Sequence, residues 1–377
     1  MRQKGSDRKT ILDELKIRSQ KNQHYIQGRI LCSMCTQPHP IAKEAYNLFF
    51  ESNLGDQGLF PAAAEIEREV VAQLSKLLNS QTACGFIVTG GTEANLLALL
   101  VAKGTAKTNA PEVILPQSAH FSFTKICRIL NIKPLYAPLD HNFRVDIKAV
   151  KQFVNDNTVA LVGTAGTAEL GTIDPLEGLS EIATQHELHL HVDAAFGGLV
   201  LPFIPNNPYQ FDFSLKGVKS ITVDPHKMGM AAIPAGGILF QNPTMLNSLK
   251  TQTPYLNDKT HYTFVGTRSG AAAASAWAVL QLLGREGFQK TITTCMKNTV
   301  HIAKGLEKAG FNLVCEPTLN VVAFKSQNTK SLAMQLWKQG WFVSYIPRYD
   351  CIRIVVMPHV KRRHATAFLA TLGTEKL

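Results

Sequence analysis

Short apolar runs that alternate with amphipathic helical patterns are the feature that most constrains the fold of this chain. Such runs predict buried strands at residues 84–91, 112–117, 158–166, 188–195 and 220–224. Helical patterns, for example at residues 92–104 and 175–187, lie between them. Unbroken apolar strands joined through helices favour a mainly parallel α/β sheet with helices on both faces. In such sheets, ligands bind at the carboxyl ends of the strands.

A change of pattern after about residue 270 predicts a second, smaller domain. Residues 271–310 have the composition of a long helix, and short apolar runs and further helices follow it. We therefore expect an N-terminal helical segment over residues 1–50, a large α/β domain over residues 51–285 and a small α+β domain over residues 286–377.

Composition limits the class of protein. The chain has 377 residues and a net charge of +11, but its basic residues are dispersed, and the densest cluster, at 359–364, has no aromatic residue for base stacking. No apolar run reaches the ~18 residues of a membrane span, and the charged N-terminal residues lack the apolar core of a signal peptide. We therefore expect no nucleic-acid partner, no membrane association and a cytoplasmic location.

The cysteines favour reduced thiols rather than a metal site. There are seven, scattered along the chain, as is usual in a reducing compartment. Cys32 and Cys35 form one C-x-x-C pair, but no second pair or histidines at ligand spacing follow it closely. We expect ordinary buried thiols and no bound metal.

Lys227 lies in a stretch, residues 222–240, that is otherwise mostly small or apolar. A lysine in such surroundings usually extends its ammonium group to water. Alternatively, burial lowers its pKa, so that the neutral amine can form a Schiff base. The lysine alone does not decide between these interpretations.

Three other features follow predicted strands. Gly91 and Thr92 begin a helix, where backbone N–H groups and a hydroxyl can bind an anion, although a glycine turn with a threonine N-cap is the alternative. His120 could lie against a flat aromatic ligand or be structural. Asp193 ends an apolar strand, where its carboxylate either caps the next turn or binds a protonated ring nitrogen. In this order, with Lys227, these features match the needs of pyridoxal phosphate.

The motifs GGTEAN, AHFSFTK, HVDAAFGG, DPHKMGMAAIPAGG and GTRSG together resemble those of group II pyridoxal-phosphate-dependent amino-acid decarboxylases. The chain is most similar to the short archaeal-type tyrosine/aspartate decarboxylases, over about residues 28–360. The resemblance implies fold type I, with a mainly parallel sheet of the seven-stranded type, and a homodimer with shared active sites. It also implies decarboxylation of an L-amino acid, tyrosine to tyramine or aspartate to β-alanine, through an external aldimine and a quinonoid.

The resemblance implies a role for each matching residue. Lys227 would form the Schiff base with the cofactor, Asp193 would bind the pyridine nitrogen, and His120 would stack on one ring face. The other implied cofactor-binding residues are Gly91, Thr92, Thr167, Ala195, His226 and, reaching the partner subunit, Gly266 and Thr267. Ala168 follows Thr167 where related sequences often have another threonine, so the position of the hydroxyl stays open.

Further candidates concern the substrate. Tyr255 is the first candidate for the acid that returns a proton to Cα, with a packed loop tyrosine as the alternative. Arg353 has a fork that suits a carboxylate, although a structural ion pair is an equal alternative. By the same resemblance, Asn53 and Leu54 would line the entrance.

The substrate itself stays open in the sequence. An aspartate enzyme would need a second cation, for which Arg348 and Lys259 are candidates. A tyrosine enzyme would instead need an apolar slot with one hydrogen-bond partner.

Two other functions remain possible at this stage. A carbon–carbon lyase resembling sphingosine-phosphate lyase would use the same cofactor and a similar GGTE and HK frame, but such enzymes usually carry a membrane helix. A basic binding protein on an inactive enzyme fold would have no need of Lys227, Asp193 and His120. Replacing Lys227 with alanine separates an enzyme from a binding protein.

Overall fold

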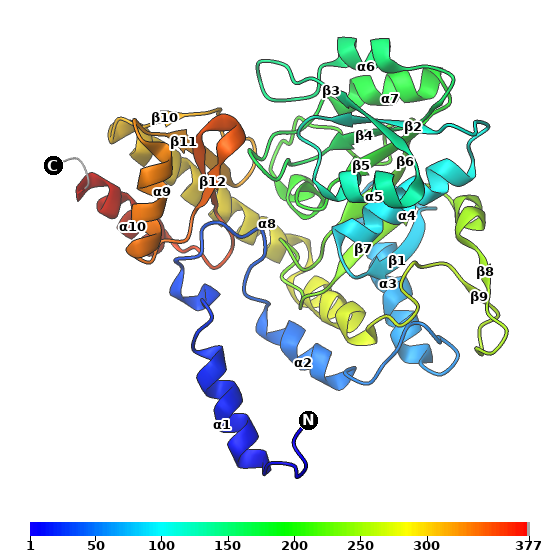
Figure 1. The fold of residues 1–377 in the computed structure, drawn as a ribbon, viewed down its shortest axis with the longest axis horizontal. Coiled ribbons are helices and arrows are strands. Elements are labelled where there is room, and N and C mark those ends of the chain that lie inside the picture. Colours follow the sequence, from blue (N-terminus) through cyan, green and yellow to red (C-terminus); the bar gives the residue numbers. More distant parts are fainter. Residues whose placement is uncertain (375–377) are drawn as a thin grey trace.

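The computed structural model describes residues 1–374, and a seven-stranded sheet forms the centre of its larger body (Figure 1). The strands are β1 (Cys84–Val88), β2 (Glu112–Pro116), β3 (Lys133–Ala137), β4 (Thr158–Thr164), β5 (His189–Asp193), β6 (Val218–Val223) and β7 (Gly236–Phe240). Their order is β1-β7-β6-β5-β4-β2-β3, and only β7 runs antiparallel to its neighbours in this sheet. The expected mainly parallel α/β sheet is confirmed.

Two strands of this sheet are additional to those that the sequence predicted. Strand β3 lies at an edge and contains Pro134, and β7 begins with Gly236 and Gly237. Proline and glycine both weaken the sequence pattern of a strand. Pairing with β1 and β6 places β7 inside the sheet despite its glycines.

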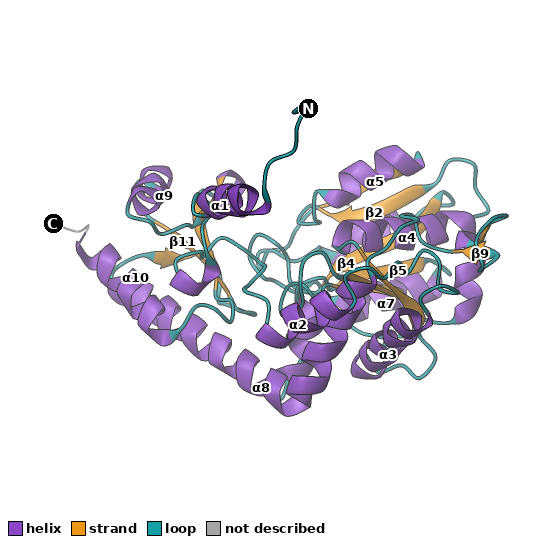
Figure 2. Ribbon diagram, turned by 90° about the horizontal axis from the view of Figure 1, so that it is seen from below, coloured by secondary structure: helices purple, strands orange, loops and turns teal. Residues whose placement is uncertain are grey.

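Helices cover both faces of the sheet, as Figure 2 shows. The helices of this body are α3 (Pro61–Leu77), α4 (Gly91–Gly104), α5 (Ser122–Leu130), α6 (Ile147–Phe153) and α7 (Leu176–Gln185). Successive side chains of β2 point to opposite faces: Val113 and Leu115 join a core with α4 and α5, whereas Ile114 joins the core that contains α3 and α7. Burial on both faces explains the unbroken apolar pattern of the strands.

A smaller body has its own sheet and core. Its strands are β10 (Asn312–Leu313), β11 (Val321–Lys325), β12 (Ser344–Ile346) and β13 (Cys351–Val355), and its helices are α9 (Thr329–Lys338) and α10 (Arg362–Thr374). The long helix α8 (Gly270–Lys308) joins the two bodies (Figure 1), and its regular geometry is interrupted at Gly284. This interruption lies next to the domain boundary predicted at residue 285, which stays a prediction.

The N-terminal residues contact both bodies. Helix α1 (Arg8–Ser19) has no buried residue and extends away from the rest of the chain (Figure 1). Helix α2 (Pro40–Leu48) places Ala42 in the larger core, whereas Leu31 is buried in the smaller one. Two short strands, β8 (Thr251–Gln252) and β9 (Thr260–His261), form a separate hairpin. Within residues 1–374, no helix is long and apolar enough to cross a membrane, and no acidic, histidine or cysteine cluster could hold a metal ion.

Candidate active site

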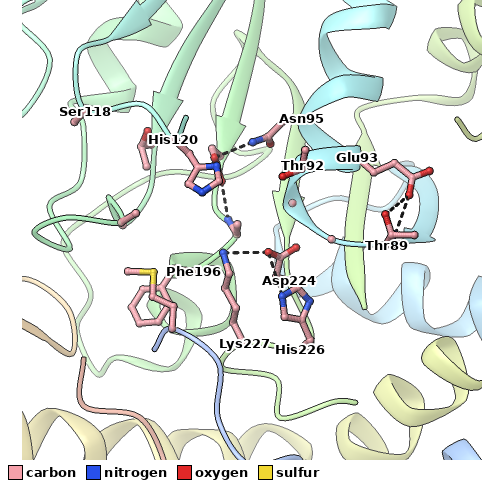
Figure 3. A pocket seen from close by; sticks show the side chains of 18 residues that line it. Thr89, Thr92, Glu93, Asn95, Ser118, His120, Phe196, Asp224, His226 and Lys227 are labelled. Atoms are coloured by element: carbon pink, nitrogen blue, oxygen red, sulfur yellow. Dashed lines mark hydrogen bonds and ion pairs between the residues drawn. The ribbon is translucent and has the colours of Figure 1, made fainter. Parts of the chain in front are cut away.

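A cavity of about 300 Å³ lies at the carboxyl ends of β4, β5 and β6 (Figure 3). This is the edge at which parallel sheets bind ligands. Seven residues that the sequence singled out line the cavity together: Gly91, Thr92, His120, Asp193, Ala195, His226 and Lys227. Residues far apart in the sequence therefore meet at one place, although their individual roles stay predictions.

One wall of the cavity is the start of helix α4. The helix begins at Gly91, and Gly90 precedes it with a φ of 142°, a conformation that favours glycine. The alternative of a threonine N-cap is wrong, because Thr92 lies inside the first turn and Gly90 holds the cap position without a side-chain bond. The carboxylate of Glu93 instead accepts hydrogen bonds from the backbone N–H and hydroxyl of Thr89, at 2.9 and 2.7 Å. The first N–H groups of α4, which have no partner within the helix, therefore adjoin the cavity.

Glycine is also required on the neighbouring strand. A Cβ atom at Gly236 in β7 would lie 2.3 Å from the Cα of Gly90, closer than two non-bonded carbon atoms can approach. The absence of a side chain at Gly236 lets the Gly90 turn settle against the sheet. This contact positions the start of α4 at the cavity.

Lys227 follows β6, and its ammonium group lies 3.1 Å from the buried carboxylate of Asp224 (Figure 3). Burial by itself lowers the pKa of Lys227, but the carboxylates of Asp224 and Asp193 outweigh that effect, so the pKa is raised overall. Of the two interpretations left open for Lys227, the one in which burial lowers its pKa is therefore not supported. The physical reason is the Asp224 carboxylate, whose pairing with Lys227 the sequence did not suggest.

Asp193 and His120 occupy another part of the cavity. The carboxylate of Asp193 accepts hydrogen bonds from the backbone N–H of Ala195 at 3.1 Å and from the side-chain amide of Asn95 at 3.0 Å. The first bond caps the turn after β5, so the turn-capping interpretation is correct and leaves the carboxylate at the cavity. Burial lowers the pKa of His120 below its usual value, which favours a neutral ring that can stack on a flat ligand.

Two predicted residues, Thr167 and Arg353, lie near the cavity without lining it. The hydroxyl of Thr167 bonds to that of Thr172 at 2.8 Å, and the neighbouring Ala168 lines the cavity instead. The guanidinium of Arg353 donates to the backbone carbonyls of Ala168 and Cys32. His226 does line the cavity, and its ring bonds to the carbonyl of Ala235 at 2.6 Å.

The remaining predicted residues lie away from this cavity. Tyr255, in the turn between β8 and β9, is 85% exposed. Gly266 and Thr267 are exposed, and Leu54 is buried. The side-chain oxygen of Asn53 accepts hydrogen bonds from the backbone N–H groups of Gly55 and Arg268, at 2.8 and 3.2 Å, so the two segments are joined.

The candidate second cations also lie elsewhere. Arg348 donates to the backbone carbonyl and the side-chain oxygen of Gln117, at 2.6 and 3.1 Å. Lys259 donates to the carbonyl of Leu256 at 3.0 Å. Within the described part of the chain, neither side chain lines the cavity.

Several cavity residues were not predicted: Met34, Asn95, Ser118, Thr164, Phe196 and Asp224. Three of them, Ser118, Thr164 and Asp224, each have a buried oxygen atom without a hydrogen-bond partner in the protein. Unpartnered buried polar atoms are costly, so these oxygens suit a ligand with polar groups. Together with the N–H groups of α4 and the carboxylate of Asp193, they fit the phosphate, hydroxyl and ring nitrogen of pyridoxal phosphate.

The cysteines are all unpaired, but their burial differs from the expectation. Cys32 and Cys35 are only partly buried, whereas Cys127, Cys295 and Cys351 are fully buried. Burial raises the pKa of both thiols of the C-x-x-C pair. The prediction of free thiols is confirmed, and the two thiols of this pair, expected to be buried, are only partly so.

Comparison with known proteins gives consistent results. Residues 50–327 match the Pyridoxal-dependent decarboxylase conserved domain. The chain is 48% identical to a "Probable L-tyrosine/L-aspartate decarboxylase" of Methanothermobacter thermautotrophicus, over 92% of this chain and 97% of the relative. It is 45% identical to a "Probable L-aspartate decarboxylase" of Archaeoglobus fulgidus, over 96% of this chain and 97% of the relative.

Solved structures share the fold. A sphingosine-1-phosphate lyase of Burkholderia pseudomallei has a TM-score of 0.90 and 28% identity, covering 99% of this chain and 91% of its own. A glutamate decarboxylase of Lactobacillus brevis has a TM-score of 0.88 and 23% identity, covering 100% of this chain and 94% of its own, and it shows the fold alone. The expected fold type I is confirmed by these structures. The domain match and the archaeal relatives identify the cofactor as pyridoxal phosphate and the activity as amino-acid decarboxylation. The chain belongs to the pyridoxal-dependent decarboxylase family.

Proposed function

We propose that this enzyme decarboxylates L-tyrosine or L-aspartate in the cavity at the carboxyl ends of β4, β5 and β6. The observation that carries the proposal is the meeting of Lys227, Asp193 and His120 with the start of α4 around one cavity. The names of the two archaeal relatives support these two amino acids as substrates. Pyridoxal phosphate, when bound, supplies an electron sink for the pair of electrons left when the carboxylate departs.

The residues of the cavity would divide the binding of this cofactor. Lys227 would attach it covalently through Nζ, and Asp193 would hold its ring nitrogen in the charged form. His120 would stack on one face of the ring, with Ala195 against the other. The N–H groups at the start of α4, with Thr92, would bind the phosphate, as helix N-termini bind anions, and His226 would lie close by.

Asp224 adds a function that the sequence did not suggest. Its carboxylate lies 3.1 Å from Nζ of Lys227, and one of its oxygens has no other partner in the protein. It would therefore hold the charged amine in place and accept a proton when the amine becomes neutral. We propose that Asp224 prepares Lys227 for attachment.

The second part of the proposal is a homodimer with shared active sites. Tyr255, Gly266 and Thr267 are exposed on their own chain, which leaves them accessible to a partner subunit. We propose that Tyr255 supplies the proton for Cα in the partner's site, and that Gly266 and Thr267 contact the partner's phosphate. Thr167 would lie beside the cofactor and position the adjoining Ala168, which lines the cavity.

The substrate would approach from the side of Met34 and Phe196, which add apolar surface to the cavity. Arg353 is the candidate for binding the substrate carboxylate. Its guanidinium donates to the carbonyl of Ala168, which lines the cavity, and its Nε has no partner in the protein. Asn53 and Leu54 would line the entrance from the partner subunit. The seven free cysteines support a reducing compartment, and we propose the cytoplasm.

The test is a measurement of cofactor attachment and of carbon dioxide release on the same sample. We expect a coloured protein in which borohydride fixes pyridoxal phosphate onto Lys227, as peptide mass spectrometry would show, and release of carbon dioxide from tyrosine or aspartate. Lys227→Ala should lose the covalent attachment, whereas Lys216→Ala, at an exposed position, should keep it.

The possible outcomes separate the alternatives. Attachment without carbon dioxide release from any amino acid would favour a lyase, like the structurally similar sphingosine-1-phosphate lyase. Absence of attachment in the parent protein would contradict the proposal. Light scattering of the intact protein would test the homodimer separately.

A further inference from the structure

A chain of hydrogen-bonded polar side chains, referred to below as the polar chain, is buried in the sheet directly beneath Asp193. In β5, His189, His191 and Asp193 occupy alternate positions and so point to the same face, and in β6 Ser220 and Thr222 do the same. The strand register pairs His191 with Ser220 and Asp193 with Thr222. The fold therefore places a row of polar side chains inside an otherwise apolar sheet.

Asn95 of α4 joins this row to Asp193. Its amide nitrogen donates to the Asp193 carboxylate at 3.0 Å and, more weakly, to the Ser122 hydroxyl at 3.3 Å. Its amide oxygen accepts from the Thr222 hydroxyl at 2.7 Å and contacts Nε2 of His191 at 3.0 Å. Asn95 is 1% exposed, so these bonds are shielded from bulk solvent.

The direction of each hydrogen bond in this series follows from the bond between Asn95 and the carboxylate of Asp193. An ionised carboxylate only accepts, so the amide nitrogen of Asn95 must face Asp193 and the amide oxygen must face His191. The Nε2 atom of His191 must then carry the proton, which makes Nδ1 an acceptor for the Ser220 hydroxyl at 2.8 Å. Ser220 in turn accepts from Nε2 of His189 at 2.7 Å.

Burial keeps both histidines in the form that this order requires. Burial lowers the pKa of His191 to about 4 and that of His189 to about 3, so both rings are neutral near pH 7. A neutral ring has one donor and one acceptor nitrogen, as each link needs. The chain ends at His189, which lines a different cavity at the amino ends of β4, β5 and β6.

Such a chain of polar side chains is not explained by a gain in the free energy of unfolding. Buried polar groups contribute little net stability, and apolar residues of similar size often replace them without loss. A proton relay is also unsuitable, because the amide of Asn95 does not readily pass protons. The remaining function of the chain is to fix the orientation of Asn95.

We propose that Asn95 is a positioning residue for Asp193, and that the chain through His191, Ser220 and His189 locks its amide so that Asp193 remains an anion facing the cofactor ring nitrogen. This inference rests on the proposed function of Asp193. It deepens that function by assigning the control of the ring nitrogen's charge to Asn95, which lines the cavity beside Asp193, and to the side chains that hold Asn95 from behind.

Two changes at Asn95 test the proposal. Asn95→Leu removes the donor to Asp193, and Asn95→Asp places a second carboxylate there, with which Asp193 would share a proton. Asn298→Leu is the matched control, because Asn298 is a buried asparagine of α8 that bonds only to the carbonyl of Val360 among the described contacts. Thermal unfolding of all variants measures the cost in stability.

The decisive measurements are made without substrate. We expect the dissociation constant for pyridoxal phosphate to rise about 10- to 100-fold in both Asn95 variants, the size of one charge-assisted hydrogen bond. Nuclear magnetic resonance of cofactor labelled at the ring nitrogen should show a protonated nitrogen in the parent and in Asn298→Leu, and a less protonated one in the Asn95 variants. A merely structural residue would change stability but not this signal.

A second pair of variants keeps the proposal testable if Asn95→Leu does not fold. His191→Gln can still donate to Asn95 and accept from Ser220, so it should keep the protonated ring nitrogen, whereas His191→Leu should lose it. Unchanged affinity and an unchanged nitrogen signal in folded Asn95→Leu, or equal signals in His191→Gln and His191→Leu, would overturn the proposal. If the parent protein itself binds no pyridoxal phosphate, the proposed function fails instead.

Discussion

The buried ion pair between Arg268 and Glu67 allows a quantitative prediction. Both side chains are about 4% exposed, and the guanidinium donates to both carboxylate oxygens. Arg268 also donates to the carbonyls of Ile87 and Leu54, at 2.7 and 3.4 Å, and Glu67 accepts from the N–H of Ile87 at 2.8 Å. The pair thereby joins α3, β1 and the two loops that contain Leu54 and Gly266.

Removing one member leaves a buried charge without its partner. We expect Glu67→Leu and Arg268→Met each to lower the free energy of unfolding by about 3–5 kcal/mol. Unfolding of 377 residues has an entropy of about 0.8 kcal/mol per kelvin, from roughly 2.1 cal/mol/K per residue. Each single variant should therefore lower the melting temperature by about 4–6 °C.

The double variant distinguishes an ion pair from two independent residues. Removing both charges leaves only neutral groups without partners, so the double variant should be more stable than either single variant. Scanning calorimetry at one protein concentration measures all four proteins, because melting of an oligomer depends on concentration. A single variant that melts within about 1 °C of the parent, or a double variant whose loss equals the sum of the two, would refute the reasoning.

Three further predictions concern the site and its support. Burial raises the pKa of Asp174 to about 6 from an ordinary 3.8. Its protonation therefore contributes fully to the free energy of unfolding below pH 3.8, and this contribution is lost as pH rises through 6. Asp174→Asn should flatten that part of a profile of unfolding free energy against pH. Gly236→Ala should displace Gly90 and weaken binding of pyridoxal phosphate, measured by titration, and unchanged binding would contradict the contact. Asp224→Asn should lower the pKa of Lys227, because it removes the nearest carboxylate; competitive amine labelling against pH measures this shift, and an unshifted profile would contradict the argument.

The sequence predicted the parts of the site that depend on local pattern. Apolar strands, glycines at a strand-to-helix turn and polar residues directly after strands are all visible in single segments, as at Gly91, His120, Asp193 and Lys227. The topology of parallel sheets then brings these strand ends to one edge. Their common location in one cavity is therefore predictable from the order of elements.

Residues whose importance comes from a distant partner could not be found in this way. Asn95 is an ordinary polar residue of a helix pattern until α4 packs over β5 and β6 and meets Asp193, 98 positions later in the chain. Gly236 is only a glycine in a weak strand pattern until β7 meets the Gly90 turn. The positions of Tyr255 and of Arg353 likewise follow from tertiary packing, which leaves one exposed and the other bonded to backbone carbonyls.

The sequence by itself determined the α/β architecture, the cofactor and the family, because periodicity, turn residues and short motifs are local properties of the chain. Only the tertiary structure decided the charge state of the site. The pKa of Lys227 is raised rather than lowered, because Asp224 lies 3.1 Å from its amine in a buried setting. Electrostatic energies depend on distance and burial, and neither is defined until the chain has folded.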